Sequence, residues 1–334
     1  MRMGMNPTDY SLFRHIASAV EARTKPYRIE SGAESGAPRT CQLRYNRPML
    51  WGLFRLLSIL WLAAPLQTLS QQAPPPASAA RILLLPKRLV GGEPATLAVL
   101  DVNGRLTPGV TVNFSSGYHL ITNTTGRALF VAPANPGVIY ATIGSRSARV
   151  YTTILTAAEV NLSLLQVSTA PQFASLADRF ELAGNGFCGD ADANTVLVGG
   201  KPALVLASSR AALIALPPTD LAPGPANIEV SCSKRSAPTF SMTFLDLSLD
   251  ADASPLAPGE HRTLTVDVRG TAAQVPLEAR NLAPKVAELS GGNPVKVSSS
   301  GGAENAARFE LIGREHGNFL ISVRLLPRPS PLRR

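Results

Sequence analysis

The chain has 334 residues, of which 45% are hydrophobic and 16% charged, and it contains 28 prolines and 26 glycines. This length exceeds that of a usual single domain and predicts about two or three domains, each able to bury its own core. The hydrophobic content argues against a disordered chain, and the many Gly and Pro residues favour short strands joined by turns over helical bundles. We therefore expect an all-β protein.

The net charge of +9 is concentrated at the two ends of the chain. Residues 1–70 carry nine Lys/Arg against four Asp/Glu, and residues 324–334 carry four Arg and no acidic residue. Residues 71–323 hold 19 charges of each sign. Since a nucleic-acid-binding protein needs a basic surface on its folded part, the neutral body argues against nucleic acid as a partner.

A secretory signal peptide is predicted at residues 49–70. Arginines precede a short apolar run from Leu56 to Leu66, and the small residues Thr68 and Ser70 follow it, which is the three-part pattern of such a signal. Because the run is short for a membrane span, we expect cleavage near Ser70 rather than an uncleaved anchor. The expected location is secreted, periplasmic or at the cell surface.

Two segments flank this signal. Residues 1–48 are polar and mixed in charge, and we interpret them as a non-native or disordered extension, with Met49 as the true start. Residues 71–80 contain three consecutive prolines and are typical of an extended linker.

Residues 81–156 are predicted to form a first β-sandwich. Apolar runs bounded by turn residues predict its strands at 82–85, 95–100, 110–114, 128–131, 138–143 and 148–155. Asn103-Gly104 lies between two of these runs and favours a tight hairpin turn. Through this dipeptide and the Pro136-Gly137 turn, the segment resembles the bacterial immunoglobulin-like modules of surface proteins.

The strongest pattern lies within residues 157–238, between Arg179 and Cys232, where four short Val/Leu/Ile-rich runs are separated by Gly, Pro, Asn and Asp. Such spacing is typical of a β-sandwich. The stretch resembles the IPT/TIG family of immunoglobulin-like domains in Gly184 with Phe187, Val196 to Gly200 with Ala203, Leu213 to Pro217, and Gly224 with Val230. The resemblance implies a sandwich and implies no reaction.

Residues 239–327 are predicted to form a third β-sandwich. Residues 239–249 read as one long strand, shared between the end of the second domain and the start of the third. Further strands are expected at 261–268, 274–279, 286–289, 295–297, 308–311 and 319–326. Residues 328–334 are interpreted as a flexible basic tail.

Cys188 and Cys232 are the two cysteines that a cleaved chain would keep. In an immunoglobulin-like order they lie on an early strand of one sheet and a late strand of the other, where inter-sheet bridges form. Export would permit the bond, so we predict a disulfide, with two buried free thiols as the alternative.

Two patterns between Gly184 and Asn194 suggest ligands. Gly184, Gly186 and Gly189 match G-x-G-x-x-G, but no helix follows to receive a phosphate, so we interpret these glycines as turn residues with positive φ. Asp190, Asp192 and Asn194 alternate like the first ligands of a calcium loop, although the rest of an EF-hand is missing. We expect a polar turn there, with a weak calcium site as the alternative.

No catalytic motif stands out, and we expect neither an enzyme nor a cofactor. The histidines are scattered, and both tryptophans lie in the signal region. Tyr118 and His119, in a Gly-led loop, form the one exposed-looking aromatic pair and the candidate ligand contact.

The sequence thus favours three tandem immunoglobulin-like sandwiches in a non-enzymatic structural or adhesive protein of the cell envelope, with a protein partner bound through loops or an edge strand. The alternative is a carbohydrate-binding module or accessory subunit of an exported polysaccharide-active enzyme.

Overall fold

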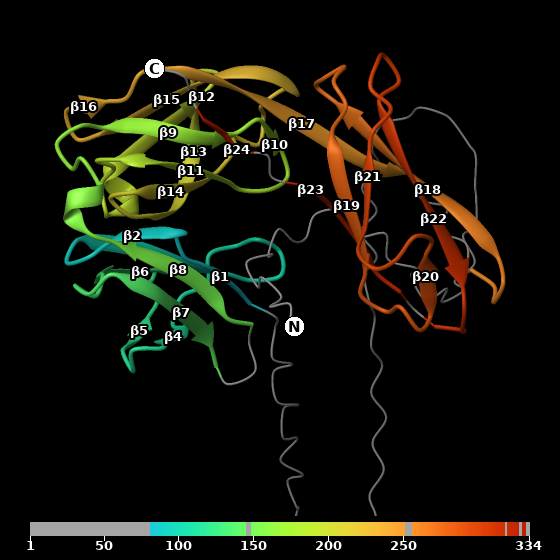
Figure 1. The fold of residues 1–334 in the computed structure, drawn as a ribbon, viewed down its shortest axis with the longest axis horizontal. Coiled ribbons are helices and arrows are strands. Elements are labelled where there is room, and N and C mark those ends of the chain that lie inside the picture. The colour runs from blue at the N-terminus through green and yellow to red at the C-terminus, as the bar shows by residue number, and fades with distance from the viewer. Residues whose placement is uncertain (1–80, 145–147, 251–255, 318, 327–328, 332–334) are drawn as a thin grey trace, which may run out of the picture. The chain divides into compact units, whose positions relative to one another are not determined.

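The computed structural model describes residues 81–144, 148–250, 256–317, 319–326 and 329–331. The predicted signal peptide, the Pro-rich linker and the N-terminal extension lie outside these residues. The described chain consists of β-strands and two short 3-10 helices, Ala157–Glu159 (η1) and Ala191–Ala193 (η2). The strands form immunoglobulin-like sandwiches (Figure 1), so the predicted all-β class is confirmed.

The first sandwich pairs a three-stranded sheet with a five-stranded sheet. The smaller sheet has the order β1 (Ile82–Leu84), β3 (Pro94–Leu100), β6 (Arg127–Val131). The larger has the order β2 (Arg88–Val90), β8 (Val150–Leu155), β7 (Gly137–Ile143), β4 (Thr111–Phe114), β5 (His119–Ile121). Alternate side chains such as Leu97, Val112 and Phe130 fill the core between them. The three-residue strands β2 and β5 were not predicted, because so short a segment carries no periodicity.

The tight turn predicted at Asn103-Gly104 forms, but it does not join the two predicted strands on either side of it. Gly104 does turn the chain with φ +76°, but β3 and β4 belong to different sheets. After this turn the two chain segments pair antiparallel at one bridge only, between Leu100 and Leu106. The chain then crosses to the other sheet, as the connections of a sandwich require.

The second sandwich contains strands β9 to β17. Their bounds are β9 (Gln166–Pro171), β10 (Phe173–Ser175), β11 (Phe180–Asn185), β12 (Asn194–Val198), β13 (Lys201–Ser208), β14 (Ala212–Leu216), β15 (Gly224–Cys232), β16 (Arg235–Ser236) and β17 (Phe240–Asp250). One sheet runs β9-β11-β14-β13 and the other β12-β15-β17, with β10 parallel to β17. β13 belongs to both: residues 201–203 pair with β12, and from Leu204 on the strand pairs with β14, with a bulge between Val205 and Ala207. Phe187, Leu213 and Phe244 are fully buried in this core.

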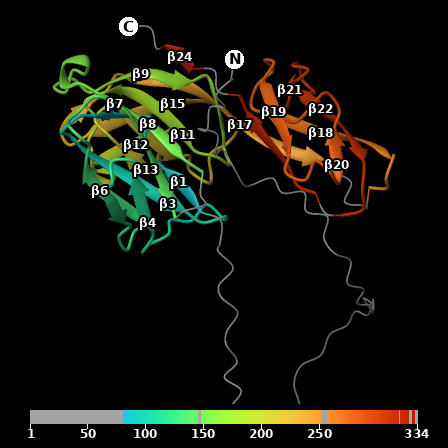
Figure 2. The ribbon, with the colours of Figure 1, turned by 60° about the horizontal axis from the view of Figure 1, so that its bottom comes forward.

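β17 continues from the second sandwich into the third (Figure 2). Residues 240–244 pair with β15, and residues 246–250 pair with β18. The third sandwich consists of β18 (His261–Arg269), β22 (Ala306–Gly313) and β20 (Ala287–Leu289) in the sheet with β17, facing β21 (Val295–Ser298), β19 (Pro276–Asn281) and β23 (Ile321–Leu325). Leu264, Leu277 and Phe309 lie in its core.

The C-terminal tail is not simply flexible, which corrects the sequence interpretation. Residues Pro329–Pro331 form β24, which pairs antiparallel with the edge strand β9, Ser330 opposite Ala170. Proline cannot donate a ladder hydrogen bond and is therefore tolerated at a sheet edge, as here.

Candidate functional site

The first two sandwiches share a buried junction, and β3 explains how it forms. On one face of β3, Leu97 and Val99 point into the first core. On the other face, Ala98 and Leu100 join a separate apolar cluster with side chains of the second sandwich. The other members of that cluster are Ile82, Leu84, Leu206, Ala207 and Ile214, with Leu106 and Leu216 at its margin. Since β3 is buried on both sides, it is almost continuously apolar, as doubly covered strands are.

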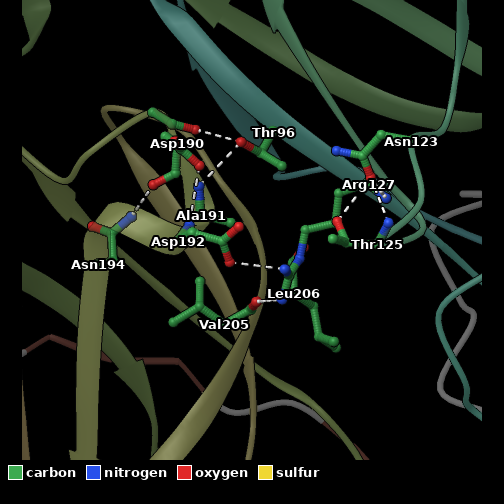
Figure 3. Close-up of polar contacts among 11 residues, drawn as sticks. Thr96, Asn123, Thr125, Arg127, Asp190, Ala191, Asp192, Asn194, Val205 and Leu206 are labelled. Carbon is green, nitrogen blue, oxygen red and sulfur yellow. Dashed lines mark hydrogen bonds and ion pairs between the residues drawn. The ribbon is translucent and has the colours of Figure 1, made fainter.

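Arg127 is the central polar residue of this junction (Figure 3). It begins β6, and its guanidinium donates from Nε to the carbonyl oxygen of Leu206 (3.2 Å) and from Nη2 to that of Val205 (2.6 Å). Nη1 donates to Oδ1 of Asp192 (2.8 Å). The Arg127 side chain is 8% exposed, whereas that of Asp192 is 68% exposed. The bulge of β13 near Val205 leaves these carbonyls available for the arginine.

Thr96 attaches the loop before β12 to the first sandwich. Its hydroxyl donates to the carbonyl of Gly189 (2.8 Å) and accepts from the backbone N–H of Ala191 (3.1 Å) (Figure 3). Asn194 closes the same loop from the other side, donating to the carbonyls of Cys188 and Asp190. The Thr96 and Asn194 side chains are both buried and both hydrogen-bonded, so the contact is specific as well as stable.

Of the three glycines that we expected to be turn residues with positive φ, only one has this conformation. Gly186 has φ +70°, which suits glycine. Gly184 and Gly189 do not have positive φ, and a Cβ atom at these positions would collide with the carbonyls of Gln166 and Pro94. For these two the reason for glycine is close backbone approach, and at Gly189 that approach is the junction itself.

Three further polar contacts cross the junction. The Glu181 carboxylate accepts from the backbone N–H of Lys87 (2.9 Å), Arg210 Nε lies 3.4 Å from the Glu93 carboxylate, and the Ser209 hydroxyl donates to the carbonyl of Arg88. Burial raises the pKa of the Glu181 carboxyl above its usual range, and Lys87 opposes this shift in part.

Asp178 and Arg179, close to Glu181 in the chain, form a half-buried ion pair with 3.3 Å between Nη1 and Oδ1. Burial raises the pKa of Asp178 and lowers that of Arg179, while their mutual attraction acts in the opposite direction on both. The pair lies on the second sandwich, just before β11.

Each of the three calcium candidates has a partner within the protein. Asp190 accepts from the backbone N–H of Asp192, Asp192 is paired with Arg127, and the Asn194 side-chain oxygen accepts from the backbone N–H of Cys188 (2.9 Å). Within the described residues, no group of three His, Cys, Asp or Glu side chains could hold a metal ion. The structure uses this loop to join two sandwiches.

Cys188 and Cys232 are joined by a disulfide. Cys188 follows β11 and Cys232 ends β15, so the bond connects the two sheets of the second sandwich, as the sequence predicts. Ser208 and Asn194 both donate to the Cys188 carbonyl and fix the loop that carries it.

Tyr118 and His119 lie at the turn between β4 and β5. Tyr118 is 53% exposed, with its ring 6.3 Å from that of Phe114, and His119 is exposed on β5. Ile121, two residues after His119 in β5, is 63% exposed. None of the described helices is long and apolar enough to span a bilayer.

Comparisons with known proteins find similar solved structures but no matching family. No protein-family model matches the sequence, and no curated protein matches it significantly. Similar solved structures include SGBP-B of the mixed-linkage glucan utilization locus of Bacteroides ovatus, solved with a mixed-linkage heptasaccharide (11% identity, 74% of this chain and 75% of that chain, TM-score 0.26). Others are the BSP domain of a biofilm-associated protein (14%, 48% and 29%, TM-score 0.24) and a tandem pair of titin immunoglobulin domains (13%, 50% and 97%, TM-score 0.17).

Proposed function

We propose that this chain is an exported, non-enzymatic binding protein of the cell envelope, built from tandem immunoglobulin-like sandwiches of which the second is of IPT/TIG type. In this proposal it presents the first sandwich to a protein partner. The Cys188–Cys232 disulfide supports export, because such bonds persist in oxidising compartments. The buried junction supports a presenting role, because it fixes the first sandwich on the second.

The observation that carries the proposal is the open edge of β5. β5 is the last strand of its sheet, and no described strand pairs with its outer side. The carbonyl of Tyr118 and the N–H of Thr122 point toward β4. Since the direction of backbone groups alternates along an antiparallel strand, the N–H and C=O of Ile121 point outward. No proline or lysine protects this edge, so it suits the addition of a partner's strand.

Proline at position 121 tests this mode of binding. Ile121→Pro removes the outward N–H without removing a hydrogen bond to β4, and Ile121→Thr is the matched control that shortens the side chain but keeps the N–H. We expect the purified protein to co-sediment saturably with cell envelopes isolated from the source organism. Ile121→Pro should weaken this binding about tenfold, and Ile121→Thr about twofold or less, because main-chain bonds supply the affinity. Absence of saturable binding would contradict the proposed function. Equal binding of both variants would contradict strand addition at the β5 edge.

A carbohydrate-binding role is the second candidate, favoured by the exposed ring of Tyr118. Aromatic rings of this kind present an apolar face together with a polar tip. If the chain binds carbohydrate, we expect its envelope binding to survive protease treatment of the envelopes and to be lost with Tyr118→Ala.

A further inference from the structure

The outer face of the five-stranded sheet of the first sandwich carries a regular array of polar and aromatic side chains. Cross-strand partners share a face, and His119, Asn113 and Thr142 are successive partners across β5, β4 and β7. Two residues before Thr142 in β7, and therefore on the same face, Tyr140 is the cross-strand partner of Tyr151 in β8. Core residues such as Val112 and Ala141 alternate with them. We call the set Asn113, His119, Tyr140, Thr142, Tyr151 and Arg149 the outer face.

The outer face is accessible and its polar groups are available. Asn113, His119 and Arg149 are exposed, and Tyr140, Thr142 and Tyr151 are half-buried. The two tyrosine rings lie 5.7 Å apart, and the Arg149 guanidinium lies 4.7 Å above the Tyr140 ring. Within the described residues, no hydrogen bond is recorded from the side chains of Asn113, His119 or Thr142, so they can bond a ligand.

The charge of the first sandwich is strongly positive, which the neutral sum over residues 71–323 conceals. Residues 81–156 contain seven basic residues and two acidic ones. The basic residues are Arg81, Lys87, Arg88, Arg105, Arg127, Arg146 and Arg149. The acidic residues, Glu93 and Asp101, flank β3 in the other sheet, and Glu93 pairs with Arg210. No described carboxylate lies on the outer face.

We propose that the outer face binds an anionic polysaccharide whose sugars carry carboxylates. Arg149 supplies a planar cation that matches a carboxylate. The Tyr151 ring offers apolar surface to the face of a sugar ring, while the Tyr140 ring holds the Arg149 guanidinium beside it. The row of imidazole, amide and hydroxyl groups offers hydrogen bonds to sugar hydroxyls. This inference rests on the proposed envelope-binding function in its polysaccharide form, and it assigns a surface distinct from the β5 backbone edge.

Polygalacturonate is a suitable probe, because its fully methyl-esterified form has the same backbone without charge. Affinity gel electrophoresis of the purified protein with each polymer measures binding. We expect retardation by polygalacturonate and a dissociation constant at least about tenfold weaker for the ester, since one charge-assisted contact is lost per bound carboxylate.

Two variants and a matched control locate the site. Arg149→Gln removes the cation and Asn113→Asp places a carboxylate in the centre of the array. Each is at an exposed position, so the fold should be retained. Arg105→Gln changes the net charge by the same amount, in the same sandwich, at the exposed turn after β3. We expect about tenfold weaker binding for each of the first two variants and less than about twofold change for Arg105→Gln.

Three results would overturn the inference. They are equal binding of polygalacturonate and its ester, equal losses for Arg149→Gln and Arg105→Gln, and equally tight binding of duplex DNA, which would indicate attraction to any polyanion. If envelope co-sedimentation persists while polygalacturonate is not bound, the outer-face inference fails and the proposed function stands. If the protein neither co-sediments with envelopes nor binds polygalacturonate, the inference and the proposed function both fail.

Discussion

Replacing Arg127 by methionine tests the junction at its most buried polar group. The change keeps an unbranched apolar stem of similar reach and removes the guanidinium, which leaves the carbonyls of Val205 and Leu206 without their donor. Bonds from a charged donor contribute about 1.5–3 kcal/mol each. Part of this is offset because the variant no longer buries a charge. We therefore expect the free energy of unfolding to fall by about 2–4 kcal/mol.

Asp192→Ala is the contrasting variant, because it removes only the exposed partner of the same arginine. The Asp192 side chain is 68% exposed, and exposed ion pairs contribute about 0–1 kcal/mol. Arg127 keeps both carbonyl partners in this variant.

Urea unfolding, followed by far-UV circular dichroism, measures the free energy of unfolding of both variants. The slope m of that free energy against urea concentration should stay the same, which checks that the transition itself is unchanged. The reasoning is refuted if Asp192→Ala destabilises the protein as much as Arg127→Met, or if Arg127→Met costs less than about 1 kcal/mol. Either result would mean that the carbonyl bonds of Arg127 do not hold the junction.

Three further predictions follow from individual contacts. Replacing Cys188 and Cys232 by serine should lower the free energy of unfolding by about 2–5 kcal/mol, and reduction of the native protein should have the same effect; unchanged urea midpoints would argue against the bond. The pKa of Glu181 is raised by burial, so its contribution to stability decreases as pH rises from its ordinary pKa through the raised one, and Glu181→Gln should gain stability relative to the native protein as the pH rises above the ordinary pKa of a glutamate carboxyl; a relative loss would show the opposite sign. Deleting residues 329–334 should speed amide hydrogen exchange in β9 while the circular dichroism spectrum stays unchanged, whereas unaltered exchange in β9 would contradict the β24 pairing.

Much of the fold could be predicted because its strands have local signals. Runs such as 95–100 and 138–143 are apolar segments bounded by turn residues, and they correspond to β3 and β7 within one residue. The disulfide followed from the expected order of strands. β5 and the pairing of β24 escaped notice because a three-residue strand, or one flanked by prolines, has no such signal.

The junction could not be predicted from local pattern alone. Arg127 finds its partners 65 to 79 positions away in the chain, and nothing next to it distinguishes it from a solvated arginine. One signal was present: apart from Thr96, the run of β3 from Ala95 to Leu100 is apolar and lacks the polar alternation of a strand with one wet face. For Asp190, Asp192 and Asn194, whose alternation suggested a polar turn or a weak calcium site, the sequence could not show that each side-chain oxygen has a different partner in space.

The central claim is that the first and second sandwiches form one cooperative unit through their shared junction. Native-state hydrogen exchange in increasing urea tests it at Leu97 and Leu182, which are fully buried in the two separate cores. We predict that both amides exchange through a common opening with the same free energy and urea dependence, and that Arg127→Met lowers both equally. Separate openings, with only one of the two changed by Arg127→Met, would contradict it.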